Sequence, residues 1–84
     1  METNASDILL SLQGHYLEVW KVEDAVCVQY ENSYIKDGPV LIGDFGKGGT
    51  FEGACNDYLS KIRGRTLVFK AFDGDSRKEI TVLG

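Results

Sequence analysis

The chain has 84 residues, 43% of them hydrophobic and 11% aromatic, and its formal net charge is −4 at pH 7. This length predicts a single domain over residues 1–84 with a small core, and the apolar content excludes a disordered chain. No run approaches the roughly 20 apolar residues that span a membrane, and the N-terminus lacks the features of a signal peptide, so we expect a cytoplasmic protein with no membrane partner.

The first third of the chain predicts a short helix followed by a β-hairpin. Apolar residues over 7–12 share one helical face, which predicts the helix. Two apolar runs then predict strands over 15–22 and 25–30, and Glu23 and Asp24 between them predict a tight turn.

The middle of the chain is richer in polar residues and glycine. Residues 31–38 predict a polar loop, and 40–42 are short and β-branched enough to predict a third strand. The segment 43–49 contains four glycines and predicts a flexible loop.

The clearest element is an amphipathic helix over 50–63. Thr50 fits its N-cap, and Gly64 fits the position just after its end. Apolar residues recur with the spacing of one helical face, at Phe51, Ala54, Cys55, Tyr58, Leu59 and Ile62. The N-cap, the apolar face and the glycine after the last turn therefore all predict the same helix.

Two further strands are predicted over 66–72 and 79–83, joined by a turn over 73–76 that is rich in Asp and Gly. The order of elements predicts an α+β domain. Its four- to five-stranded, mainly antiparallel sheet would carry the long helix on one face, together with a short N-terminal helix.

No catalytic or metal-binding constellation is present in the sequence. Cys27 and Cys55 occupy apolar positions typical of buried free thiols, although one disulfide between them stays open. His15 is the only histidine, and one histidine with two separated cysteines cannot form a conventional zinc site. We therefore expect a non-enzymatic protein with no catalytic residues, no metal and no cofactor.

The glycine-rich loop 43–50 suggests one binding function, because it leads into a helix N-terminus, where free N–H groups attract anions. Its candidate residues are Lys47, Gly48, Gly49 and Thr50. The spacing does not match a phosphate-binding P-loop, since Gly48 is followed by Gly49 where that motif requires lysine. A small-ligand or anion-binding domain is thus an alternative reading.

Charge is distributed unevenly along the chain. Residues 1–60 hold ten acidic residues and three lysines, whereas 61–84 hold six basic residues and three acidic ones. This acidity argues against direct binding of nucleic acid. The basic residues could form a local patch or only complement the helix end and the strand edges; they are Lys61, Arg63, Arg65, Lys70, Arg77 and Lys78.

Six acidic residues lie in or beside the first hairpin and the loop after it, namely Glu18, Glu23, Asp24, Glu31, Asp37 and Asp44. Carboxylates can take the place of phosphates on the Lys and Arg side chains of a nucleic-acid channel. Tyr34 and Phe45 are candidate aromatic anchors for such a contact. These eight residues form the predicted partner-binding site.

The run 49–69, which reads GTFEGACNDYLSKIRGRTLVF, resembles a segment of small uncharacterised phage and prophage proteins and covers about a quarter of the chain. In size and acidity the chain is similar to phage-borne inhibitors of host defence, including anti-CRISPR proteins. Residues 50–54 are also similar to the helix start of HicB-type antitoxin domains, although the rest of the chain departs from that pattern.

The resemblance to phage-borne inhibitors implies a small binding protein that blocks a nucleic-acid-handling host enzyme, such as a CRISPR effector, in the host cytoplasm. Besides the anion-binding domain, a structural module that forms a homodimer through a sheet face or edge is an alternative. We expect a monomer or a homodimer.

Overall fold

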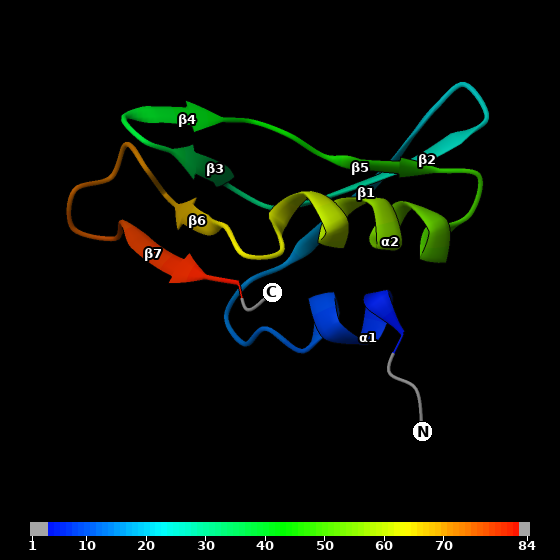
Figure 1. The fold of residues 1–84 in the computed structure, drawn as a ribbon, viewed down its shortest axis with the longest axis horizontal. Helices are drawn as coiled ribbons and strands as arrows, with labels where there is room; N and C mark the ends of the chain where they lie inside the picture. The colour runs from blue at the N-terminus through cyan, green and yellow to red at the C-terminus, as the bar shows by residue number, and fades with distance from the viewer. Residues whose placement is uncertain (1–3, 83–84) are drawn as a thin grey trace.

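The computed structural model describes residues 4–82, which form two helices and seven strands (Figure 1). The strands make two antiparallel sheets, one of three strands and one of four. The longer helix, α2 (Phe51–Ile62), packs on the smaller sheet, and the short helix, α1 (Ala5–Leu10), packs on α2. The predicted α+β class is therefore confirmed, with more strands than expected and with these strands divided between two sheets.

The smaller sheet contains the predicted hairpin. β1 (Leu17–Val22) and β2 (Ala25–Tyr30) pair in antiparallel register, and the turn between them has two residues. Glu23 in that turn has a φ of 56°, the left-handed conformation that tight hairpin turns use. β5 (Gly46–Gly48) pairs with the other side of β2, so the strand order is β1-β2-β5.

The larger sheet has the order β4-β3-β6-β7. It consists of β3 (Ser33–Asp37), β4 (Val40–Ile42), β6 (Thr66–Phe69) and β7 (Lys78–Thr81). β6 is shorter than predicted because Lys70, with a φ of 52°, leaves the extended conformation. The end of the last predicted strand, at residue 83, lies outside the described residues.

The prediction of a polar loop over 31–38 is wrong, because most of that segment forms β3. Ser33 is only 4% exposed, and its Oγ donates a hydrogen bond to the carbonyl oxygen of Tyr30 at 2.7 Å. The hydroxyl of Tyr58 accepts a hydrogen bond from the backbone N–H of Tyr30 at 3.2 Å and lies 3.4 Å from Ser33 Oγ. These bonds satisfy the polar groups and allow a polar stretch to start a buried strand.

The prediction of a flexible loop over 43–49 is also wrong, since β5 lies directly against α2. A Cβ atom on Gly46 would meet the backbone nitrogen of Tyr58 at 2.6 Å, and one on Gly48 would meet that of Ala54 at 2.6 Å. Both distances are shorter than a Cβ contact allows, so the close approach of strand and helix requires glycine at both positions.

Helix α2 agrees with the prediction at its start, its apolar face and its end. The Thr50 side chain accepts a hydrogen bond from the Gly53 N–H at 3.0 Å, and Gly64 after the helix has a φ of 77°. Five of the six predicted face residues are buried, namely Ala54, Cys55, Tyr58, Leu59 and Ile62. Phe51, in the first turn, is 37% exposed.

Candidate functional site

Four of the predicted acidic residues lie on the β1–β2 hairpin. Glu18 is on β1, Glu23 and Asp24 form the turn, and Glu31 directly follows β2. All four side chains are exposed, and no ion pair involves them within residues 4–82. We call these four residues the hairpin acids.

The hairpin turn projects beyond the end of β5 (Figure 1, cyan). Only one of the two hairpin strands pairs with a further strand. β2 pairs with β5, whereas β1 is the edge strand of the smaller sheet. A protruding tip with two adjacent carboxylates has the geometry to enter a concave, positively charged surface.

The other two acidic residues of the predicted set do not lie on this hairpin. Asp37 ends β3 and has one oxygen 3.9 Å from Nη1 of Arg65. Asp44 precedes β5 and lies 3.6 Å from Nζ of Lys61. Within the described residues, the structure therefore separates the predicted group of six into four hairpin acids without an ion pair and two carboxylates that have partners.

Lys61 of α2 holds the β4–β5 connection against the helix through a hydrogen bond and an ion pair. Its Nζ donates to the carbonyl oxygen of Phe45 at 2.8 Å and lies 3.1 Å from Oδ2 of Asp57. The same carboxylate oxygen accepts the backbone N–H of Lys47 at 2.9 Å. Burial alone would lower the pKa of Lys61, but the carboxylates of Asp57 and Asp44 outweigh that effect and raise it.

The pKa of the Asp57 carboxyl is correspondingly lowered. Its largest cause is the hydrogen bond from the Lys47 backbone, and the Lys61 ammonium adds to it. Since Asp44 and Phe45 belong to this network, their first role is to hold β5 on α2.

The predicted aromatic anchors are packed against other rings. Phe45 lies 5.6 Å from the ring of Trp20, and Tyr34 lies 5.8 Å from the ring of Phe72 in an edge-to-face arrangement. Phe45 is nevertheless 36% exposed. Part of the Phe45 side chain therefore remains accessible to a partner.

Sequence reasoning missed the two most exposed aromatic side chains. Tyr16 is 74% exposed and Phe72 is 85% exposed. Both lie just outside a strand that was predicted to include them, because β1 begins at Leu17 and β6 ends at Phe69. Only the exact ends of the strands could have revealed this, and a sequence pattern does not define them well.

Three of the predicted anion-binding residues, Lys47, Gly48 and Gly49, line a cleft with the hairpin turn, and the fourth, Thr50, does not line it. This cleft of about 510 Å³ is lined on one side by Lys47, Gly48 and Gly49 and on the other by Glu23 and Asp24. Two carboxylates facing the cleft oppose the binding of an anion. The Thr50 side chain, moreover, already caps α2.

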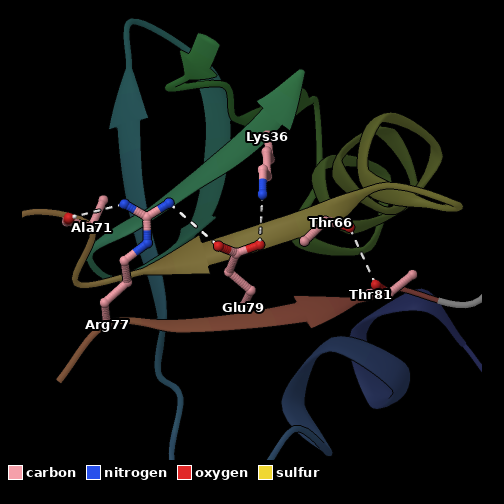
Figure 2. Close-up of polar contacts among 6 residues, drawn as sticks. All are labelled: Lys36, Thr66, Ala71, Arg77, Glu79 and Thr81. Atoms are coloured by element: carbon pink, nitrogen blue, oxygen red, sulfur yellow. Dashed lines mark hydrogen bonds and ion pairs between the residues drawn. The ribbon is translucent and has the colours of Figure 1, made fainter. Parts of the chain in front are cut away.

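On the larger sheet an ion-pair network joins strands that are not neighbours. Figure 2 shows Glu79 of β7 between Lys36 of β3, at 3.0 Å, and Arg77, at 3.3 Å, with β6 passing beneath the first pair. The hydrogen bond from Lys36 is the main reason why the pKa of Glu79 is lowered. The hydroxyls of Thr66 and Thr81 lie 3.2 Å apart on the same side (Figure 2).

The two cysteines are poor candidates for a nucleophile in the part of the chain that the structure describes. Cys27 and Cys55 are buried free thiols, and burial raises the pKa of Cys55, which makes it a weak nucleophile. Between residues 4 and 82 no group of three His, Cys, Asp or Glu side chains could hold a metal ion. No helix in the same range is long and apolar enough to cross a membrane.

No protein family, no curated protein and no solved structure matches this chain.

Proposed function

We propose that the protein is a stoichiometric binding protein whose hairpin acids occupy a positively charged surface of a protein partner. The observation that carries this proposal is that four carboxylates on one hairpin are exposed and take part in no ion pair of the described region. Asp37, Asp44, Asp57 and Glu79 all pair with basic side chains of the same chain, while the hairpin acids pair with none in the described region.

The partner chemistry follows from the shape and charge of the hairpin. A Lys- or Arg-rich channel that normally holds phosphates presents several cations at short spacing, and a tip with adjacent carboxylates can satisfy them through charge-assisted hydrogen bonds. The most concrete partner is a CRISPR effector, for which the protein would be a phage-type inhibitor acting in the host cytoplasm. The similarity in size and acidity to phage-borne inhibitors supports this choice.

The test is inhibition of target-DNA binding by purified CRISPR effectors, measured by fluorescence anisotropy as the protein is titrated. We expect inhibition that is complete near one equivalent. Asp24→Lys should raise the concentration needed by about tenfold, because it replaces an attractive contact with a repulsive one. If no effector is inhibited at ten equivalents, the inhibitor assignment is wrong.

Asp75→Lys is the matched control. Asp75 also lies in an exposed hairpin turn and takes part in no ion pair of the described chain, but it belongs to the β6–β7 connection. This variant should inhibit like the unmodified protein. Equal losses in both variants would mean that total charge matters and that the hairpin has no specific role.

A further inference from the structure

A second polar pocket lies at the opposite end of the hairpin from the glycine-rich cleft, where β1 begins and β2 ends. It has a volume of about 490 Å³ and is formed where the α1–β1 connection, the β2–β3 turn, the end of β6 and the start of β7 meet. Its lining includes three side chains that can carry positive charge, namely His15, Lys70 and Lys78. We call it the cationic pocket.

His15 is held in place by a stacking contact. Its ring centroid lies 3.8 Å from that of Phe69, a buried residue of β6, with an angle of 31° between the planes. The imidazole is therefore partly covered and does not extend freely into solvent. A ring fixed against the core presents its nitrogen atoms in a defined direction.

The electrostatics of the imidazole indicate that positive charge converges on it. Burial lowers the pKa of His15, and the ammonium groups of Lys78 and Lys70 lower it further. Glu31 and Tyr16 also line the pocket, but neither reverses this direction. This lowering of the pKa favours the neutral imidazole, which can donate one N–H.

The two lysines differ from most other basic residues of the C-terminal third. Lys61, Arg65 and Arg77 each pair with a carboxylate, and these pairs neutralise much of the basic cluster noted in the sequence. Lys70 and Lys78 form no ion pair within residues 4–82. Their charge is available to a ligand.

The backbone at the pocket is also unusual. Asn32 has a φ of 55° and Lys70 a φ of 52°, and the N–H of Lys70 donates to the carbonyl oxygen of Asn32 at 3.0 Å. Left-handed conformations are uncommon for residues other than glycine, and they occur often where a binding site must be held in one shape. Here both such residues line the cationic pocket.

We propose that the cationic pocket binds a small molecule through a phosphate group. Lys70 and Lys78 match the two charges of a phosphate monoester dianion, and the His15 imidazole and the Asn32 amide can supply further hydrogen bonds. The Glu31 carboxylate at the same pocket weakens anion binding, so its removal should strengthen it. This site is independent of the hairpin acids' role as a contact for a protein partner, except at Glu31.

The experiment is a titration followed by NMR at constant ionic strength, with inorganic phosphate, adenosine 5′-monophosphate and sulfate as probes. We expect saturable shifts at the His15 ring and at the Asn32 and Lys70 amides with the two phosphate probes. The pKa of His15 should rise when phosphate is bound, because the dianion stabilises the imidazolium. Tighter binding of adenosine 5′-monophosphate than of inorganic phosphate would identify a larger ligand as the natural one, and equal binding would identify free phosphate.

Three variants and one control complete the test. Lys70→Gln and Lys78→Gln should each weaken phosphate binding about three- to fivefold, and Glu31→Gln should strengthen it by a similar factor. Lys21→Gln removes an exposed lysine outside the pocket and should change nothing. The proposal is overturned if the shifts are linear in phosphate, if sulfate and phosphate behave alike without saturation, or if Lys21→Gln has the same effect as the pocket variants.

Discussion

Glu52 of α2 accepts two hydrogen bonds from Ser6 of α1, one from the backbone N–H at 3.2 Å and one from the hydroxyl. Asn4 is the N-cap residue of α1, but its side chain makes no capping hydrogen bond. Glu52 therefore accepts one of the free N–H groups at the start of the short helix, although it lies 46 residues away along the chain. It also places a negative charge at the positive end of the helix dipole. One carboxylate thus caps α1 and fastens it to α2.

Replacing Glu52 by alanine should release α1 from α2. We expect a loss of about 1–2 kcal/mol in the free energy of unfolding, because an N–H and a hydroxyl lose a charged acceptor. Urea denaturation measures the loss, and hydrogen exchange should show faster exchange in α1 than in α2. Glu18→Ala, on the exposed surface of β1, should change the free energy of unfolding by less than about 0.5 kcal/mol. It should leave the exchange rate in α1 unchanged. Equal exchange in α1 for both variants would contradict this role of Glu52.

Alanine at Gly46 or Gly48 should be severely destabilising. The added methyl group would overlap backbone atoms of α2, and β5 cannot move away from the helix without disturbing its pairing with β2. We expect a loss of about 3 kcal/mol or more, or a failure to fold. Gly49→Ala is the control, since nothing lies within 4 Å of its added Cβ, and its stability should change by less than about 0.5 kcal/mol. Thermal unfolding of the three variants gives the comparison.

Tyr58→Phe should cost about 1–2 kcal/mol although it removes only one oxygen atom. Ser33 Oγ uses its single hydrogen on the Tyr30 carbonyl oxygen, so the Tyr58 hydroxyl donates to Ser33 and accepts from the Tyr30 N–H. The variant leaves that buried N–H without an acceptor, which is the costly part. Tyr16→Phe, on a ring that is 74% exposed, should be neutral in the same urea series. A neutral Tyr58→Phe would show that water replaces the hydroxyl.

Asp57→Asn should reduce stability at neutral pH but not in acid. The pKa of Asp57 lies below its ordinary value of 3.8, so the charged carboxylate stabilises the folded state above that pH and the contribution is lost as the pH falls through the lowered pKa. Because the side chain is 37% exposed, we expect only about 0.5–1 kcal/mol at pH 7. Urea midpoints measured from pH 7 to pH 2.5 should converge for the two proteins. A constant difference across that range would contradict the assignment.

The elements that the sequence predicted correctly are those determined by local signals. α2 has a cap, an apolar stripe and a terminal glycine, and the β1–β2 hairpin has a two-residue turn between alternating runs. β3 and β5 depend on distant partners. β3 is stabilised by Tyr58, and β5 pairs with β2 and packs through its glycines against α2. A local pattern contains neither fact, so both were predicted as loops.

In the candidate site, too, local features could be predicted from the sequence and contacts between distant segments could not. The exposure of Glu18, Glu23, Asp24 and Glu31 could be predicted, because charged residues on a hairpin seldom become buried. The pairing of Asp44 with Lys61 could not, since it depends on how the β4–β5 connection crosses α2. The cationic pocket was equally invisible, because four separate segments contribute to it.

The close approach of β5 to α2 also offers a way to recognise distant descendants of the same ancestor. Gly46 and Gly48 cannot accept any side chain while the strand stays where it is. Thr50 caps the helix that packs against these glycines, and Tyr58 lies on the buried face of the same helix. The spacing of all four residues along the chain is therefore set by the packing of β5 on α2. Genes that diverged beyond overall sequence similarity should therefore still encode Gly-x-Gly-x-Thr followed eight residues later by an aromatic hydroxyl.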